Sequence, residues 1–152
     1  MLADLLTIEE KFGYLKGINF TYMGDARNNM GNSLMVACAK MGLNFTACAP
    51  KELFPAEDLV QTCRGIAEEN GCTITLTEDV KEGTANADVL YTDIWVSMGE
   101  PDSVWESRIK LLTPYQVNKA AMSNAKPTCI FMHCLPSFHD TNTTIGAEIA
   151  EK

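Results

Sequence analysis

The chain has 152 residues, of which 46% are hydrophobic and 21% are charged, and its formal net charge is −8. This size and composition fit one ordinary globular domain with a substantial core, and they exclude a disordered or fibrous protein. The negative charge argues against nucleic acid and anionic membrane surfaces as partners, because both reward clustered Lys and Arg. Small molecules or other proteins are the expected partners.

No targeting or membrane-spanning segment is predicted. Residues Met1 to Asp4 contain no basic leader, and the longest apolar run, Leu34 to Ala39, is far shorter than a membrane span. The cysteines show no CxxC pair and fall mostly on apolar-periodic positions, as reduced, buried thiols do; they are residues 38, 48, 63, 72, 129 and 134. We therefore expect a cytoplasmic protein without disulfides.

The first predicted element is a helix that ends at Gly13, a suitable residue after a helix terminus. Its helical stripe comprises Leu2, Leu5, Leu6, Glu9 and Phe12. Because no capping residue precedes this stripe, we expect the chain to begin at a cut, with further sequence upstream.

Strands and helices then alternate along the chain. Strands are predicted at 18–23, 44–48, 73–77, 89–92 and 128–133. Helices are predicted at 34–41, 55–70 and 79–85, from Asp102 or Ser103 to 112, from Pro114 to 122, and weakly at 145–151. This rhythm predicts an α/β fold: a doubly wound, Rossmann-like sheet of five parallel strands in the order 3-2-1-4-5, with helices on both faces.

Polar residues follow three of these strands at the carboxyl edge, where open α/β sheets bind ligands. The three groups expected to meet are Asn28 with Asn29, Asp93 with Ser97, and His133 with Cys134. The Asn pair has a simpler interpretation, because such residues commonly cap the next helix. A carboxylate that follows an apolar strand must be hydrogen-bonded, solvated or paired with a cationic ligand, so Asp93 points more strongly to a site.

The last predicted strand is an apolar run that suits a strand covered on both faces. Pro136 cannot donate to the ladder, so the strand must stop near His133 and place Cys134 at the carboxyl edge. Cys134 has the alternative interpretation of an ordinary buried thiol. The position of Cys134 directly after the strand favours a role in a functional site.

The sequence disfavours cofactor sites. Gly24 and Gly31 do not form a GxGxxG motif, and no acidic residue follows the second strand to bind a ribose, which argues against a nicotinamide cofactor. Zinc would need ligands among Cys129, His133, Cys134 and His139. The first lies inside a strand, and adjacent residues rarely ligate one ion with good geometry. We expect no metal and no organic cofactor.

Three motifs carry a family resemblance: Gly24-Asp25 through Asn28-Asn29, the segment from Asp93 to Glu100, and His133-Cys134-Leu135-Pro136. Together they resemble the ornithine-binding half of ornithine carbamoyltransferase, over essentially all of residues 1–152. The family's carbamoyl-phosphate-binding domain, with its Ser-x-Arg-Thr-Arg and His-Pro-x-Gln motifs, and its final carboxyl-terminal segment are absent from this chain. Arg27 is the only arginine expected near the crevice.

The resemblance implies a transferase of arginine metabolism that moves the carbamoyl group of carbamoyl phosphate to the ornithine δ-amine, giving citrulline and phosphate. It implies that Asp93 and Ser97 hold the α-ammonium, that Asn29 and the Met98 backbone hold the α-carboxylate, and that Cys134 with Leu135 faces the δ-amine. The catalytic candidates are Cys134 and Asp93, and the parent is expected to be a homotrimer or a multiple of trimers.

Three other possibilities stay open: a carbamoyltransferase for putrescine or a modified ornithine, a nicotinamide-binding domain, and a small interaction domain. The segment from Ser97 to Gly99 favours ornithine over putrescine. The fragment alone is expected to be inactive.

Overall fold

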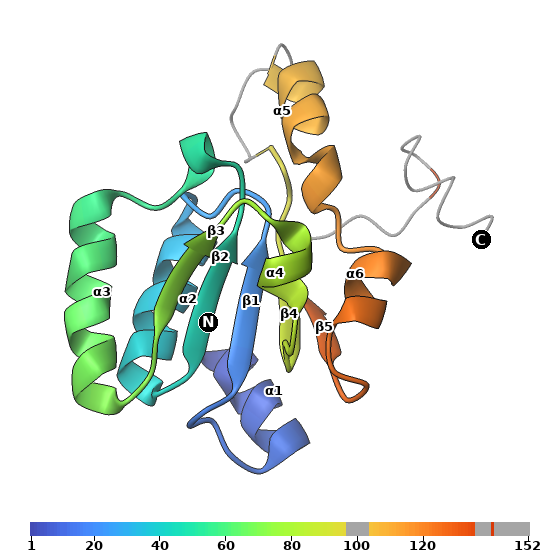
Figure 1. Ribbon diagram of the computed structural model, residues 1–152. Coiled ribbons are helices and arrows are strands. Elements are labelled where there is room, and N and C mark those ends of the chain that lie inside the picture. The colour runs from blue at the N-terminus through green and yellow to red at the C-terminus, as the bar shows by residue number, and fades with distance from the viewer. Residues whose placement is uncertain (97–103, 136–140, 142–152) are drawn as a thin grey trace.

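The computed structural model describes residues 1–96, 104–135 and 141, and its centre is a five-stranded parallel sheet in the order β3-β2-β1-β4-β5. The strands are β1 Asn19–Met23, β2 Asn44–Cys48, β3 Ile74–Thr77, β4 Val89–Thr92 and β5 Ile130–His133 (Figure 1). The predicted fold and strand order are confirmed. β1 and β4 lie side by side at the centre, so the switch point falls between them.

The helices lie on both sides of this sheet (Figure 1). They are α1 Leu2–Phe12, α2 Asn29–Met41, α3 Glu57–Asn70, α4 Val80–Thr84, α5 Trp105–Leu112 and α6 Lys119–Asn124, with short 3-10 helices η1 Lys51–Leu53 and η3 Thr113–Tyr115. Among the described residues, no helix is both long enough and apolar enough to cross a membrane.

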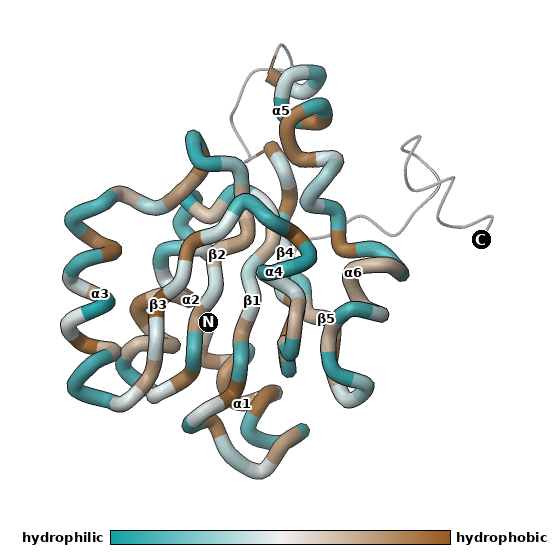
Figure 2. Tube along the Cα trace, in the orientation of Figure 1, coloured by the Kyte–Doolittle hydropathy of each residue, from teal (hydrophilic) through white to brown (hydrophobic). Residues whose placement is uncertain are grey.

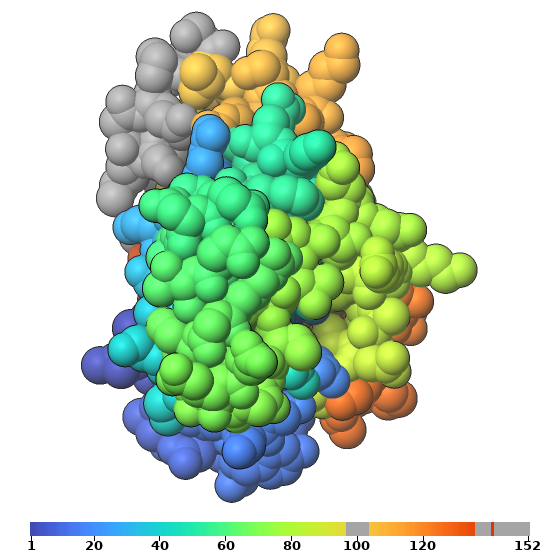
Figure 3. All heavy atoms as spheres, turned by 60° about the vertical axis from the view of Figure 1, so that its left-hand side comes forward, coloured from blue at the N-terminus to red at the C-terminus, as the bar shows by residue number. Residues whose placement is uncertain are grey.

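Two hydrophobic clusters fill the space between helices and sheet, and β4 contributes to both. Val89 and Tyr91 belong to the cluster that includes α1, α2 and α3, whereas Leu90 belongs to the cluster that includes α5 and α6. Because successive residues of a strand face opposite sides, these clusters lie on opposite faces of the sheet. Hydrophobic and hydrophilic residues alternate around α3 (Figure 2), and its side chains form one continuous surface with those of η1 (Figure 3).

Several predicted boundaries were wrong for physical reasons. The helix expected from Pro114 to 122 is two elements, η3 and α6, because Asn118 takes an extended conformation and caps a new helix by accepting a hydrogen bond from the Ala121 N–H at 3.0 Å. α2 begins at Asn29 and not at Leu34, because Asn28 caps it. The helix predicted at 145–151 lies outside the described residues.

Two predictions of burial were also wrong. In α1 the buried residues are Leu5 and Ile8, while Leu2 and Leu6 of the predicted stripe are 76% and 55% exposed. β5 is an edge strand, and the described residues do not cover both of its faces, since Phe131 is 52% exposed. An apolar run alone does not show whether both faces of a strand are covered.

Candidate functional site

The turn after β1 delivers the first polar group to the carboxyl edge of the sheet. Asn28 caps α2, and its Oδ1 accepts a hydrogen bond from the Gly31 N–H at 2.7 Å. The turn is tight, because a Cβ at Gly31 would lie 2.6 Å from the carbonyl oxygen of Ala26. Glycine at this position therefore allows the backbone to approach closely enough for the cap.

Asp93 follows β4 directly and is the centre of the site. Its Oδ1 accepts hydrogen bonds from its neighbour's backbone, the Ile94 N–H, at 2.7 Å and from the Cys134 thiol at 2.7 Å. Its Oδ2 accepts a hydrogen bond from Asn28 Nδ2 at 3.2 Å. The Asp93 carboxylate thus joins Asn28 and Cys134, which lie 65 and 41 positions away from it in the sequence.

The Cys134 thiol is held in its neutral form. Burial raises the pKa of Cys134 to about 12, and the hydrogen bond to Asp93 and the charge of that carboxylate act in the same direction. A neutral thiol near pH 7 can donate a hydrogen bond, but it is a poor nucleophile and has no charge with which to take up a proton. In this geometry the Cys134 thiol acts as a hydrogen-bond donor to Asp93.

The other predicted site residues are placed less centrally. Asn29 is exposed at the start of α2, where its Oδ1 accepts a hydrogen bond from the Met30 N–H, and Leu135 is 81% exposed. His133 Nδ1 lies against the carbonyl oxygen of Cys134. Ser97 and Met98, like His139, lie outside the described residues.

The candidate zinc ligands do not converge in the part of the chain that the structure describes. Cys129 directs its thiol to the carbonyl oxygen of Ile130 at 3.6 Å, whereas Cys134 contacts Asp93. The described residues contain no group of three His, Cys, Asp or Glu side chains arranged to hold a metal ion. All six cysteines are free thiols.

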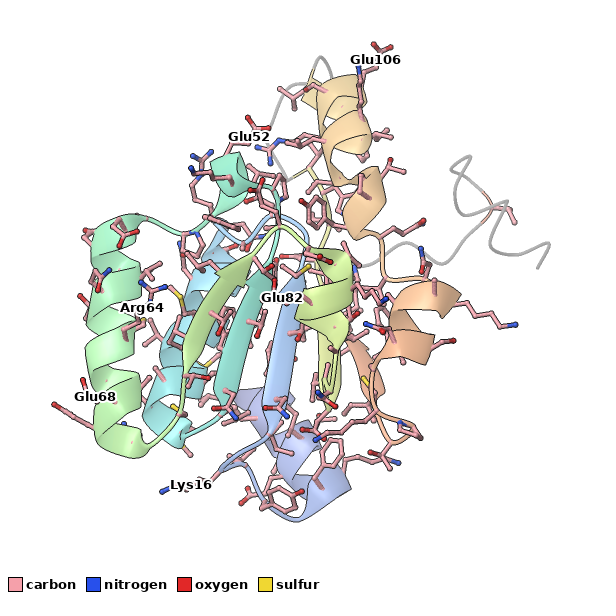
Figure 4. The ribbon with its side chains drawn as sticks, in the orientation of Figure 1. Lys16, Glu52, Arg64, Glu68, Glu82 and Glu106 are labelled. Atoms are coloured by element: carbon pink, nitrogen blue, oxygen red, sulfur yellow. The ribbon has the colours of Figure 1, made fainter. Side chains whose placement is uncertain are left out.

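Glu82 is another carboxylate among the described residues, and it already has a partner. Figure 4 shows Glu82 on α4, where its carboxylate accepts a hydrogen bond from the Thr77 hydroxyl at 2.7 Å. Asp79 caps the same helix by accepting hydrogen bonds from the backbone N–H groups of Lys81 and Glu82. These contacts give both residues a local structural role.

Sequence reasoning missed two residues at the site. Tyr22 is fully buried, and its hydroxyl lies within hydrogen-bonding distance of both amide atoms of Asn28. Arg108 on α5 forms a salt bridge of 2.6 Å with Asp25, so the expectation that Arg27 is the only arginine near the crevice was wrong. Tyr22 resembled an ordinary core residue, and nothing in the sequence pattern showed that α5 lies over this turn.

Comparisons with known proteins identify related sequences. Residues 16–151 match the family described as "Aspartate/ornithine carbamoyltransferase, Asp/Orn binding domain". The chain is similar over all 152 residues to catabolic ornithine carbamoyltransferases of Treponema denticola (73% identity) and Mycoplasma capricolum subsp. capripneumoniae (60%), of which it covers 45% and 49%.

Solved structures give the same result. An ornithine carbamoyltransferase from Pyrococcus furiosus is similar to 90% of this chain, with 41% identity and a TM-score of 0.83, and the match covers 43% of that protein. The chain therefore spans less than half the length of these relatives.

Proposed function

Because this chain belongs to the aspartate/ornithine carbamoyltransferase family, in which it matches the Asp/Orn binding domain, we propose that it is the ornithine-binding part of an ornithine carbamoyltransferase. The complete enzyme would transfer the carbamoyl group of carbamoyl phosphate to the δ-amine of ornithine. The names of the relatives from T. denticola and M. capricolum support this reaction and suggest a catabolic direction.

The observation that carries the proposal is the uncompensated charge of Asp93. Its partners in the described part of the chain are an amide N–H, a backbone N–H and a thiol, all of them neutral. An ionised carboxylate has about four acceptor positions, so Asp93 keeps room for one more donor. The α-ammonium of an amino acid would supply both that donor and the missing positive charge.

The proposed substrate pose follows from this pairing. With the α-ammonium on Asp93, and with Ser97 as its second proposed partner, the amino-acid side chain would extend toward Cys134 and Leu135. Asn29 and the Met98 backbone are the proposed partners of the α-carboxylate. The δ-amine has a lysine-like pKa of about 10.4 in water, so the complete site must bind or create its neutral, nucleophilic form.

Carbamoyl phosphate would need a second set of groups. Its charge lies on the phosphate, whose tight capture needs arginines or a helix terminus directed at those oxygens. We propose that the part of the enzyme beyond this chain supplies them and that the 152-residue chain alone is inactive. Without the second subsite the substrates lose enforced proximity, which contributes about 7 to 11 kcal/mol to barrier reduction.

The proposed contacts also disfavour two related substrates, putrescine and an α-acylated ornithine. Putrescine lacks the α-carboxylate for which Asn29 and Met98 are proposed, and an α-acylated ornithine lacks the α-ammonium. Either substrate would leave a polar group of the proposed site unpaired, which costs about 1 to 3 kcal/mol. A homotrimeric parent, or a multiple of trimers, and a cytoplasmic location remain predictions.

The test is a chimera in which this chain replaces the matching stretch of the T. denticola enzyme. Citrulline formation that requires ornithine and carbamoyl phosphate, and that putrescine and N-acetylornithine do not support, is the expected result. The isolated chain should form no citrulline and should not bind NADH in a calorimetric titration. An inactive but folded chimera, or citrulline formation by the isolated chain, would contradict the proposal.

A further inference from the structure

Asn28 makes two contacts that need different chemistry. Its Oδ1 caps α2 through the Gly31 N–H at 2.7 Å, and its Nδ2 donates to Asp93 Oδ2 at 3.2 Å. A helix cap requires only an acceptor oxygen, which Ser, Thr and Asp also supply. The contact with Asp93 requires a donor atom separate from the capping oxygen, and among the usual capping residues only asparagine has one.

The helix cap determines which way the amide faces. The Gly31 N–H is a donor only, so the amide oxygen must lie beside it and the amide nitrogen must face the opposite side. Nδ2 donates there to the Asp93 carboxylate at 3.2 Å, and it also donates at 3.0 Å to the Tyr22 hydroxyl, which lies beside both amide atoms. The orientation of Asn28 is therefore fixed by its contacts.

Tyr22 completes the hydrogen bonding of this amide. Its hydroxyl donates to Asn28 Oδ1 at 3.3 Å, and its ring is fully buried and stacks on Tyr91 with centroids 5.9 Å apart. Burial raises the pKa of Tyr22 far above its ordinary value, so the hydroxyl keeps the proton that it donates. Both donors and both acceptor positions of the Asn28 amide are occupied.

We propose that Asn28 is a positioning residue that aims the Asp93 carboxylate, and that Tyr22 holds the Asn28 amide in place for this task. The proposal rests on the proposed function, because it assigns Asp93 to the α-ammonium of ornithine. Asn28 holds Oδ2 while Ile94 and Cys134 hold Oδ1, so the plane of the carboxylate is set before the ligand arrives. Binding then costs less ordering of the site.

The kinetic test uses Asn28→Ser in the chimera described above, because serine keeps the cap and removes the N–H. The KM for ornithine should rise about tenfold, which corresponds to the loss of about 1.4 kcal/mol, while the KM for carbamoyl phosphate changes little. Tyr22→Phe should raise the ornithine KM about threefold. The double variant should resemble Asn28→Ser, because the two residues act through one contact.

Asn118→Ser is the matched control. Asn118 caps α6 in the same way, through the Ala121 N–H at 3.0 Å, and no contact in the described structure joins it to Asp93. It should leave both KM values unchanged. If Asn28→Ser behaves like this control, or weakens both substrates equally, the proposal is overturned. If Asn28→Ser does not fold, Tyr22→Phe decides the question, because it leaves the cap intact.

A second measurement needs no substrate. In the 152-residue chain, NMR should show Asn28 side-chain amide protons that exchange slowly with water, and Tyr22→Phe should accelerate their exchange about threefold or more and shift the Asp93 carboxyl signal. Unchanged exchange and an unchanged Asp93 signal would overturn the positioning role. An inactive unsubstituted chimera with these NMR effects present would instead refute only the assignment of ornithine.

Discussion

Two aspartates flank β4, and they differ in the charge of the groups that surround them. Asp88, before the strand, accepts hydrogen bonds from Lys126 Nζ at 2.8 and 2.9 Å and from the Asn19 N–H at 2.9 Å. Asp93, after the strand, has only neutral partners in the described residues. The chain therefore balances the charge of Asp88 itself, whereas Asp93 has no charged partner among the described residues, and this difference is the reason for proposing a binding role for Asp93 alone.

The cysteines near these aspartates show the same difference. Burial raises the pKa of Cys129, and the nearby charges of Asp88 and Lys126 act on it in opposite directions. Burial also raises the pKa of Cys134, but there the charge of Asp93 adds to the effect. A balanced ion pair has little net influence on its neighbours, whereas an uncompensated carboxylate perturbs the groups that approach it.

The largest expected effect comes from removing the uncompensated charge. Asp93→Asn in the chimera should weaken ornithine by about 1.5 to 3 kcal/mol, the value of a hydrogen bond to a charged group, which is about 10-fold to 150-fold in KM. The KM for carbamoyl phosphate should change far less. Steady-state kinetics with each substrate varied in turn measure both values, and an equal loss for the two substrates would show that Asp93 supports the fold instead.

Removing the balanced charge of Asp88 should lower stability and leave ornithine binding unchanged. Asp88→Asn should lower the free energy of unfolding of the 152-residue chain by about 1 to 2 kcal/mol, measured in urea. The expected loss is modest because the Lys126 side chain is 38% exposed, so solvent screens the ion pair. In the chimera the ornithine KM of the folded fraction should stay unchanged. A stable Asp88→Asn variant with weakened ornithine would remove the distinction between the two aspartates.

The sequence predicted the architecture, because the information needed for it is local. Apolar runs, helix caps and right-handed crossovers are sufficient for five parallel strands in the observed order. The convergence of Asn28, Asp93 and Cys134 followed from that order, since all three lie at carboxyl ends of neighbouring strands.

The sequence did not show which partner each polar side chain finds. Asp88 and Asp93 both adjoin an apolar strand, and Lys126 is 38 positions from Asp88, so no periodicity links that pair. In the sequence pattern of β1, Tyr22 looks like any other core residue. Its hydroxyl acquires a role only because the turn places Asn28 beside it. The wrong prediction that β5 is covered on both faces has the same origin, because coverage depends on distant segments.

A smaller effect is expected from the thiol beside Asp93. Cys134→Ser in the chimera should lower turnover about tenfold without changing the unfolding midpoint, because serine is a neutral donor of similar size but lacks the polarizable sulfur. Cys129→Ser is the control, since that thiol points to the Ile130 carbonyl oxygen, and it should keep full turnover. Metal analysis should find no stoichiometric zinc, and an equivalent of zinc that is lost in Cys134→Ser would refute the carbamoyl-transfer assignment of this residue.

A further expected effect concerns the ionisation of the two cysteines and needs no activity. The pKa of Cys134 in the folded chain, about 12, lies above its ordinary value of 9.0, so folding favours the neutral thiol. This contribution to stability is complete below pH 9 and is lost as the pH rises toward 12. At pH 9 iodoacetamide, which reacts with the thiolate, should therefore modify Cys134 at least about tenfold more slowly in the folded chain than in urea.

Asp93→Asn removes one cause of that shift and should accelerate modification of Cys134 about fivefold, while burial continues to oppose ionisation. Cys129 provides an internal control in the same sample, because its neighbours Asp88 and Lys126 are unchanged and its rate should stay constant. Peptide mapping by mass spectrometry resolves the two sites. Equal acceleration at both cysteines would indicate general loosening of the fold. No acceleration at Cys134 would show that burial alone keeps its thiol neutral. In that case the charge of Asp93 is compensated after all.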